Sequence, residues 1–220
     1  MNTSSAELAQ LGPLEQLRTG RLARRFTQLI VGLAFYGVSM AMMIRGGLGL
    51  APWDALHVGV TGHIPLSFGE VVIVISFVVL LLWIPLREIP GIGTLANALI
   101  IGAVADLTLR VLEAPEPYVE RLALTAGGVL LCGLASALYI GAQLGRGPRD
   151  GLMTGLHRVT GLSLRLVRTG LEVAVLLVGL ALGGTGVFGI GTILFALGIG
   201  PLTQAMLPWV LVGVHPRPGA

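Results

Sequence analysis

The sequence predicts an all-α polytopic membrane protein with about six transmembrane helices in two inverted three-helix repeats, each with a short re-entrant or interfacial helix. Composition is the first observation behind this prediction: 54% of the 220 residues are hydrophobic, 11% are charged, and the mean hydropathy is +0.88. An average soluble domain has about 25% charged residues. The second observation is the recurrence of uncharged runs long enough to span a bilayer. The third is an internal repeat.

The expected layout is one membrane domain over residues 26–214, with repeat one at about 26–112 and repeat two at about 122–214. A cytoplasmic segment, 1–25, precedes it and a cytoplasmic tail, 215–220, follows it. Arginines followed by an apolar run are also typical of a signal peptide, but this run is long for one and no convincing small-residue cleavage site follows. We therefore expect an uncleaved first helix.

The first expected span, residues 26–44, has no charge and ends at the glycine-rich stretch 45–49. Residues 50–63 are too few and too polar to cross a membrane alone. Pro52 suits the first turn of a helix and Asp54 suits its positive end, so a short helix is expected to start there. The remaining expected spans are 71–86, 92–109, 122–144, 169–182 and 189–210.

The internal repeat joins the two halves of the chain. One glycine–proline motif recurs at an offset of 96 residues, and a Gly-Ile-Gly-Thr motif recurs at an offset of 98. Each half contributes three spans, an odd number, so the second half is expected to insert upside down relative to the first. The repeated motif positions are Gly49, Pro52, Gly91 and Gly93 in the first half, and Gly145, Pro148, Gly189 and Gly191 in the second.

Arginine positions predict the orientation, because the cytoplasmic loops of membrane proteins are enriched in positive charge. All 14 basic residues are arginines. Three of them, Arg45, Arg110 and Arg121, fall on one side of the six-span layout, and the other 11 fall on the side of the N-terminus. This distribution predicts a multi-pass protein of the bacterial cytoplasmic (inner) membrane with both termini cytoplasmic.

Several function classes find no support in the sequence. The net charge of +3 would fit a nucleic-acid partner, but no aromatic platform for bases accompanies the arginines, so none is expected. Cys132 is the single cysteine and the four histidines have no ligand spacing, so neither a metal site nor a cofactor is predicted. Motifs of zinc peptidases, P-loop NTPases and serine hydrolases are absent, and we do not expect an enzyme.

Ionisable residues inside the apolar segments are the candidate site, because such groups are costly in a bilayer unless they have a role. Asp106 and Glu172 lie within expected spans. A structural role is an alternative for both, since Arg110 and Arg168 stand four residues away and favour ion pairs on one helix face. The sequence leaves the two alternatives open.

Asp54 and Asp150 occupy equivalent repeat positions, each two residues after a proline. Capping of a helix start is one interpretation. The other is a polar cavity between the repeats, in which Asp54 and His57 form a proton-responsive pair on one helix face. Met153 replaces His57 in the second half, so such a function would be asymmetric. Arg146 and Arg149, which flank the second proline, suit an anion or a lipid phosphate, although topology explains them equally well.

Three stretches resemble a known family. They are YGVSMAMMIRGGLGLAPWDALHVGV at residues 36–60, LLLWIPLREIPGIGTLANALIIGAVADL at 80–107, and GRGPRDGLMTG at 145–155. Together they resemble the bacterial YczE/YyaS/YitT-type integral membrane proteins, over about residues 26–207. The resemblance implies a polytopic inner-membrane protein whose biochemical activity is poorly defined, and it assigns no binding residue.

Two functions fit these observations. The first is a permease-like transporter that binds a small solute where the inverted repeats meet, as in secondary transporters of this architecture. The second is a non-transporting membrane accessory protein that modulates a partner enzyme or an envelope process. The expected partners are the lipid bilayer, a small-molecule solute, and a protein partner or further copies of this chain.

Overall fold

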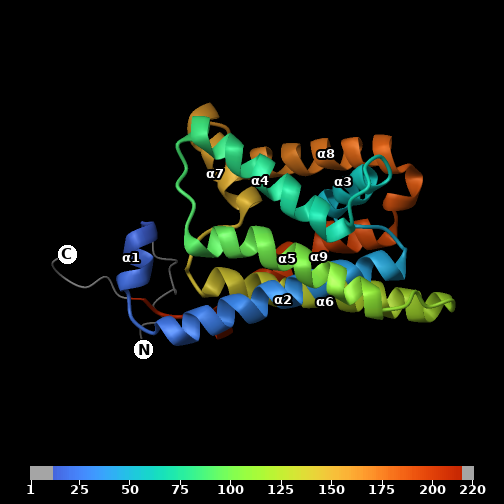
Figure 1. Cartoon of the computed structure of the whole chain (residues 1–220), viewed down its shortest axis with the longest axis horizontal. Helices are drawn as coiled ribbons and strands as arrows, with labels where there is room; N and C mark the ends of the chain where they lie inside the picture. Colours follow the sequence, from blue (N-terminus) through green and yellow to red (C-terminus); the bar gives the residue numbers. More distant parts are fainter. Residues whose placement is uncertain (1–11, 215–220) are drawn as a thin grey trace.

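The computed structural model describes residues 12–214, and within that range it is helical without a strand (Figure 1). The all-α prediction is confirmed. Six helices are long and apolar enough to span a membrane: α2, α4, α5, α6, α8 and α9. The elements are α1 (Pro13–Arg18), α2 (Leu22–Gly46), α3 (Pro52–Thr61), α4 (Phe68–Leu86), α5 (Ile92–Val111), α6 (Tyr118–Gly141), α7 (Pro148–Thr160), α8 (Leu164–Gly183), η1 (Thr185–Val187) and α9 (Ile190–Val210).

The helix bounds differ from the expected spans mainly at N-terminal ends. The first span begins within the segment expected to precede the membrane domain, at Leu22. Residues 1–11 and the tail 215–220 lie outside the described residues. The fifth span begins five residues early, at Leu164, because the Ser163 side chain accepts a hydrogen bond from a backbone N–H in its first turn. The hydropathy pattern predicted these two helix starts too late in the sequence, because charged residues in the first turns interrupt the apolar runs.

The order of long, short, long and long helices occurs twice, as α2 to α5 (half one) and α6 to α9 (half two). α2 and α6 run side by side in opposite directions, with α5 packed on α2 and α9 on α6 (Figure 1). The other four helices form a second layer, in which each short helix packs on a helix of the other half. α3 packs on α8, and α7 packs on α4.

Two arginines at equivalent positions hold α2 and α6, the central helix pair, together, one at each end of the pair. Arg25, near the start of α2, donates from Nε to the carbonyl of Ala142 at the end of α6, at 2.9 Å. Arg121, 96 residues later and near the start of α6, donates from Nε to the carbonyl of Gly46 at the end of α2, also at 2.9 Å. Each satisfies carbonyls that a helix end leaves unpaired. Arg25 is fully buried, so its role exceeds that of an orientation signal.

The repeated glycine motifs contact each other across the halves. The N–H of Gly93, at the start of α5, donates to the carbonyl of Leu144 at 2.8 Å, and the N–H of Gly191, at the start of α9, donates to the carbonyl of Leu48 at 2.7 Å. The two pairs are related by the repeat. A Cβ atom on Gly93 would lie 2.7 Å from its acceptor oxygen, so this contact requires glycine.

Gly49 and Gly145 lie in the loops that precede the short helices, with φ values of +108° and +132°. Glycine adopts such values without steric cost. Pro52 and Pro148 then begin α3 and α7 at the expected positions. The motifs are therefore the loops and helix starts through which the halves interlock. The opposite membrane orientation of the two halves stays a prediction.

The short helices are held by two repeat-related contacts, one between a large and a small residue and the other between two small residues. Trp83 of α4 covers Gly151 of α7, where a Cβ atom would lie 2.0 Å from the indole ring. Its Nε1 donates to the carbonyl of Pro148 at 2.8 Å. At the equivalent positions, Gly179 of α8 packs on Ala55 of α3, where a Cβ atom on the glycine would lie 2.6 Å from the alanine backbone. The α3–α8 pair thus meets through backbone and the α4–α7 pair through the indole.

Candidate functional site

Two cavities lie at related positions between the halves. The half-one cavity has a volume of about 40 Å³ and the half-two cavity about 230 Å³. Tyr36, Trp53 and Arg149 line both. Other lining residues are repeat counterparts, with the half-one residue first: Met40 and Ser136, Asp54 and Asp150, His57 and Met153, Val72 and Arg168, Ser76 and Glu172, Asn97 and Phe195.

The half-one cavity contains a buried acid and a buried imidazole. Asp54 is 3% exposed and His57 is 6% exposed. The Nδ1 atom of His57 lies 3.9 Å from Oδ1 of Asp54, which is too far for a hydrogen bond, and this nitrogen has no hydrogen-bond partner among the described residues. Phe68 holds the imidazole by an edge contact, with 6.0 Å between ring centroids. The pair expected from the i, i+3 spacing is therefore present on the buried face of α3.

Burial shifts both groups toward their neutral forms. α3 is not among the six candidate spans. The loss of solvation raises the pKa of the Asp54 carboxyl above its usual range and lowers the pKa of His57 below its usual range. Asp54 does not cap the start of α3 by a side-chain hydrogen bond, but it stands in the first turn, where a carboxylate suits the positive end of the helix dipole.

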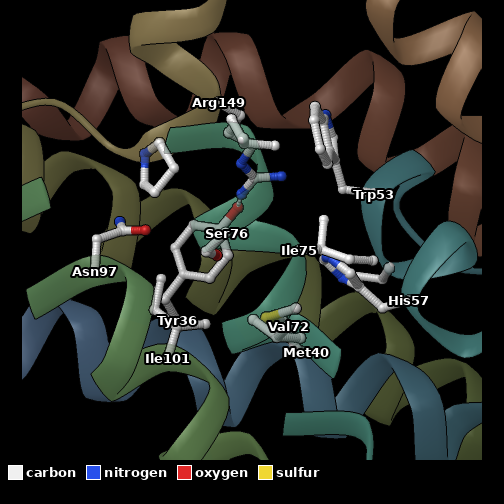
Figure 2. Close-up of a pocket in the computed structure, with 13 residues that line it drawn as sticks. Tyr36, Met40, Trp53, His57, Val72, Ile75, Ser76, Asn97, Ile101 and Arg149 are labelled. Atoms are coloured by element: carbon white, nitrogen blue, oxygen red, sulfur yellow. Dashed lines mark hydrogen bonds and ion pairs between the residues drawn. The ribbon is translucent and has the colours of Figure 1, made fainter. Parts of the chain in front are cut away.

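Arg149 enters the interior between the two cavities. One of its terminal nitrogens donates to the Tyr36 hydroxyl, and the guanidinium carbon lies 5.2 Å from the centroid of the same ring (Figure 2). The Tyr139 hydroxyl donates to Oδ2 of Asp150 at 2.6 Å. The two tyrosine rings meet edge to face, 6.3 Å apart. Arg149 and Asp150 are thus each held by a tyrosine from the central helix pair.

The two acids expected within spans have different positions. Glu172 lines the half-two cavity and pairs with Arg168 at 3.0 Å, as the spacing on one helix face suggested. Asp106 lies in neither cavity. Its carboxylate accepts from the N–H of Gly69 at 2.7 Å and from the Ser67 hydroxyl, and thereby fastens the start of α4 to α5. The structure therefore places five of the six candidates in the two cavities and leaves Asp106 apart, in a structural contact that does not involve Arg110.

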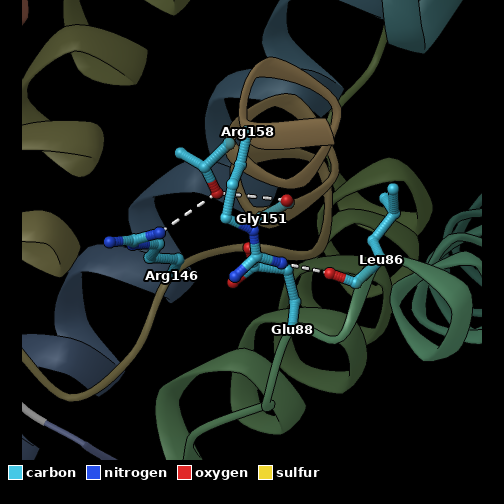
Figure 3. A network of polar contacts seen from close by, with 6 residues as sticks. Leu86, Glu88, Arg146, Gly151 and Arg158 are labelled. Atoms are coloured by element: carbon cyan, nitrogen blue, oxygen red, sulfur yellow. Dashed lines mark hydrogen bonds and ion pairs between the residues drawn. The ribbon is translucent and has the colours of Figure 1, made fainter. Parts of the chain in front are cut away.

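A second polar network holds the far end of α7. Arg158 pairs with Glu88 at 3.1 Å and donates to the carbonyl of Leu86, while Arg146 donates to the Thr154 hydroxyl at 3.1 Å (Figure 3). Arg146 and Arg149 were both considered for an anion site because they flank one proline. They do not converge, since Arg146 stays near the surface and Arg149 points inward.

Sequence comparison now places the chain in a family. The chain belongs to DUF6198, a family of unknown function, whose profile matches residues 23–208. An uncharacterized protein of Haemophilus influenzae is 38% identical over 179 residues, covering 81% of each chain. The uncharacterized membrane protein YczE of Bacillus subtilis is 34% identical over 85% of this chain and 87% of its own. The uncharacterized protein YyaS of the same organism is 30% identical over 82% and 90%.

The resemblance to the YczE/YyaS-type family is thereby confirmed, and the chain is an integral membrane protein. No solved structure matches it. These three relatives are described only as uncharacterized, so the chemistry of the two cavities rests on the residues of this chain.

Residues that sequence reasoning missed complete the site. Tyr36, Tyr139 and Trp53 line the cavities, as do Ser76 and Asn97. Tyr36 lies in the middle of the apolar helix α2, away from the helix ends where membrane tyrosines are enriched, and this was an available indication of a polar interior. The small cavity suits water or a proton, and the larger one suits a small polar molecule.

Proposed function

We propose that this chain is a permease for a small polar solute in the bacterial cytoplasmic membrane, with both termini in the cytoplasm. The solute binds in the half-two cavity, where the two halves meet, and the chain carries out no catalysis. The observation that carries this proposal is the pair of repeat-related cavities that share Tyr36, Trp53 and Arg149. Transporters built from inverted repeats place their sites at such an interface.

The size and lining of the half-two cavity support a small polar solute. Its volume of about 230 Å³ is below the roughly 300–1,000 Å³ of pockets for drug-sized ligands. Arginine and carboxylate side chains both line it, together with Ser136, Thr203 and Gln204. A solute that carries both charges, or a neutral one rich in hydroxyl or amide groups, would be matched there by opposite charges and hydrogen bonds.

The difference between the halves supports a cycle of alternating access. In half one, α4 packs on α5 so closely that a Cβ atom on Gly69 would lie 2.0 Å from the carbonyl oxygen of Gly102. Within residues 12–214, the counterparts α8 and α9 make at most marginal contact, and a Cβ atom on Gly200, the counterpart of Gly102, would meet nothing within 4 Å. In the proposed cycle the two halves exchange these arrangements, which opens the half-one side and closes the half-two side.

Solute uptake by purified protein in proteoliposomes tests the proposal. The panel should contain amino acids, polyols and small organic acids. We expect saturable uptake of one class, at least a tenfold loss in Asp150→Asn, and normal uptake in Glu15→Gln, which changes a carboxylate of α1 outside both cavities. Uptake of none of these solutes, with a deletion phenotype that depends on a partner protein, would reject the permease and favour the membrane accessory function.

Cysteine labelling in intact cells tests the orientation. A cysteine at Glu116, in the loop between α5 and α6, should react with an impermeant reagent from outside. A cysteine at Arg158, in α7, should react only after the cells are opened. The reverse pattern would contradict the cytoplasmic termini.

A further inference from the structure

We propose that Asp54 and His57 bind one proton in the half-one cavity and that this proton is the coupling ion of the solute cycle. The coupling role rests on the proposed permease function, whereas the proton site itself does not. Half two keeps the aspartate at the equivalent position, but Met153 replaces the histidine there. The proton site is therefore a property of one half alone.

The geometry leaves Nδ1 of the imidazole without a hydrogen-bond partner among the described residues and places the carboxyl close to it. Oδ1 of Asp54 lies 3.9 Å from Nδ1 of His57, and the Asp54 side chain does not cap the start of α3. The imidazole Nδ1 is buried without a hydrogen bond. A buried polar atom without a partner costs about 1–3 kcal/mol, and a buried charge costs more. Proteins retain such an unfavourable arrangement where the groups have a function. Binding and release of a proton by Asp54 and His57 would be such a function.

The half-one cavity has space for a water molecule that bridges Asp54 and His57. One water needs roughly 10–15 Å³, so a cavity of about 40 Å³ admits two or three. A separation beyond hydrogen-bond range between two polar atoms commonly holds a water. A water between Oδ1 of Asp54 and Nδ1 of His57 completes a path for the proton. Tyr36, Trp53 and Arg149, which line both cavities, connect this path to the solute.

A metal cation fits the half-one cavity less well than a proton. Within residues 12–214 no group of three or more His, Cys, Asp or Glu side chains could hold a metal ion. Asp54 is in the first turn of α3, where the positive end of the helix dipole repels cations. The guanidinium of Arg149 lines the same cavity. A carboxylic acid that simply gains or loses a proton needs no further ligands.

The groups that face the pair set its response to pH. α2 contributes the Tyr36 hydroxyl, α4 the neutral Ser76, and α5 the neutral Asn97. α7 contributes the cation Arg149, which is turned toward Tyr36. From α6, the Cys132 thiol lies close enough to Asp54 to interact with it electrostatically. From α8, Gly179 contacts the backbone of α3 and brings no charge. Arg149 is the one fixed charge in this set, so its approach to Asp54 during the cycle would release the proton.

Infrared spectroscopy on the full chain in liposomes tests the proton site without any solute. A protonated buried carboxylic acid has its own C=O stretching band, which disappears when the acid ionises. We expect this band in the wild type, its loss in Asp54→Asn, and its retention in Asp150→Asn, the matched variant in half two. Retention of the band in Asp54→Asn, or its absence from the wild type between pH 4 and pH 9, would overturn the proton site.

The role of His57 is tested by the midpoint of the same band. We expect His57→Phe to raise the midpoint by one pH unit or more, because the carboxylate loses the imidazole and the water that solvate it. Met153→Phe is the matched control and should leave the midpoint unchanged. An unchanged midpoint in His57→Phe, in a variant that still shows the band, would remove His57 from the proposal.

Coupling is tested with a pH-sensitive dye inside the proteoliposomes. A solute gradient should drive proton movement in the wild type and at least tenfold less in Asp54→Asn. Solute uptake without proton movement would overturn the coupling role while leaving the permease intact. Absence of all uptake, together with an Asp54 band that titrates, would overturn the permease and with it the coupling, and would leave the proton site standing.

Discussion

The two halves of the molecule share a backbone plan and differ in what their cavities can do. Both begin a short helix with proline and place an aspartate two residues later. In half one that aspartate is buried beside His57. In half two Asp150 accepts a hydrogen bond from Tyr139 and is surrounded by further charges. The repeat therefore fixes the position of a carboxylate, and the neighbouring substitutions decide its chemistry.

The halves differ also in how tightly they are packed. Asp106 and Gly69 hold α4 against α5, whereas the half-two counterparts Gln204 and Arg165 make no such contact among the described residues. Half one, which is the more tightly packed at this contact, has the small cavity, and half two has the large one. The proposed proton site and the proposed solute site therefore differ in size within one repeated architecture.

The largest expected effect concerns this packing difference. Gly200→Val should fold normally, because a side chain there meets nothing within 4 Å, yet it should block the close approach of α9 to α8 and reduce uptake at least tenfold. Gly102→Val should instead destabilise the chain by about 1–3 kcal/mol through overpacking. Thermal unfolding in detergent and uptake in liposomes measure the two effects. Full transport by Gly200→Val would show that the halves do not exchange arrangements.

The next effect separates the two capping arginines. Arg25→Met should lower stability by about 3 kcal/mol, because it removes the donor to the buried carbonyl of Ala142 and two further hydrogen bonds of the guanidinium. Arg121→Met, at the partly exposed counterpart, should cost about 1 kcal/mol. Chemical unfolding followed by tryptophan fluorescence compares the two variants. Equal losses would mean that burial does not distinguish the two ends of the central helix pair.

The two aspartates should respond to the same substitution in opposite directions. Burial raises the folded-state pKa of Asp54, so its cost appears as pH rises above the usual aspartate range and grows until the raised pKa is passed. Asp54→Asn should therefore raise the melting temperature at pH 8 and leave it unchanged near pH 3. Asp150→Asn should lower stability by about 1 kcal/mol, because it weakens the bond from Tyr139. Melting curves over this pH range measure both effects. If the two substitutions change the melting temperature in the same direction at pH 8, the distinction between the aspartates is rejected.

The smallest effect concerns Glu172 and Arg168. Their pair lies on a partly exposed face of α8, so Glu172→Gln should change stability by only about 0.2–1 kcal/mol. If Glu172 contacts the solute, uptake should fall well beyond what this loss explains, whereas a purely structural pair would leave uptake unchanged. The ratio of transport rate to amount of folded protein decides between the two.

The elements were predictable to the extent that local chemistry defines them. Prolines at helix starts and glycines at breaks placed α3 and α7, and apolar runs placed the six spans within a few residues. The starts at Leu22 and Leu164 were missed because arginines within the first turns masked helices that continue into them. In the site, the spacing of Asp54 and His57 on one face was informative, since residues three apart on a helix meet whatever the helix packs on.

The contacts between distant residues were not predictable. An ion pair with Arg110 was one alternative for Asp106, but its carboxylate binds backbone and hydroxyl groups nearly 40 residues away in sequence. Arg25 and Arg121 looked like orientation signals, because nothing local distinguishes an arginine that reaches a lipid headgroup from one that caps a neighbouring helix. Tyr36 and Tyr139 came together only through the antiparallel pairing of α2 and α6.

The sequence by itself determined the helices, the repeat and the equivalence of Asp54 and Asp150, because hydropathy, helix-start chemistry and motif order are properties of short segments. Only the tertiary structure decided that each short helix packs on the opposite half and that one cavity is small and the other large. Those outcomes depend on shapes that meet across the chain, such as the indole of Trp83 over Gly151. Such complementarity belongs to pairs of surfaces, and no local pattern specifies it.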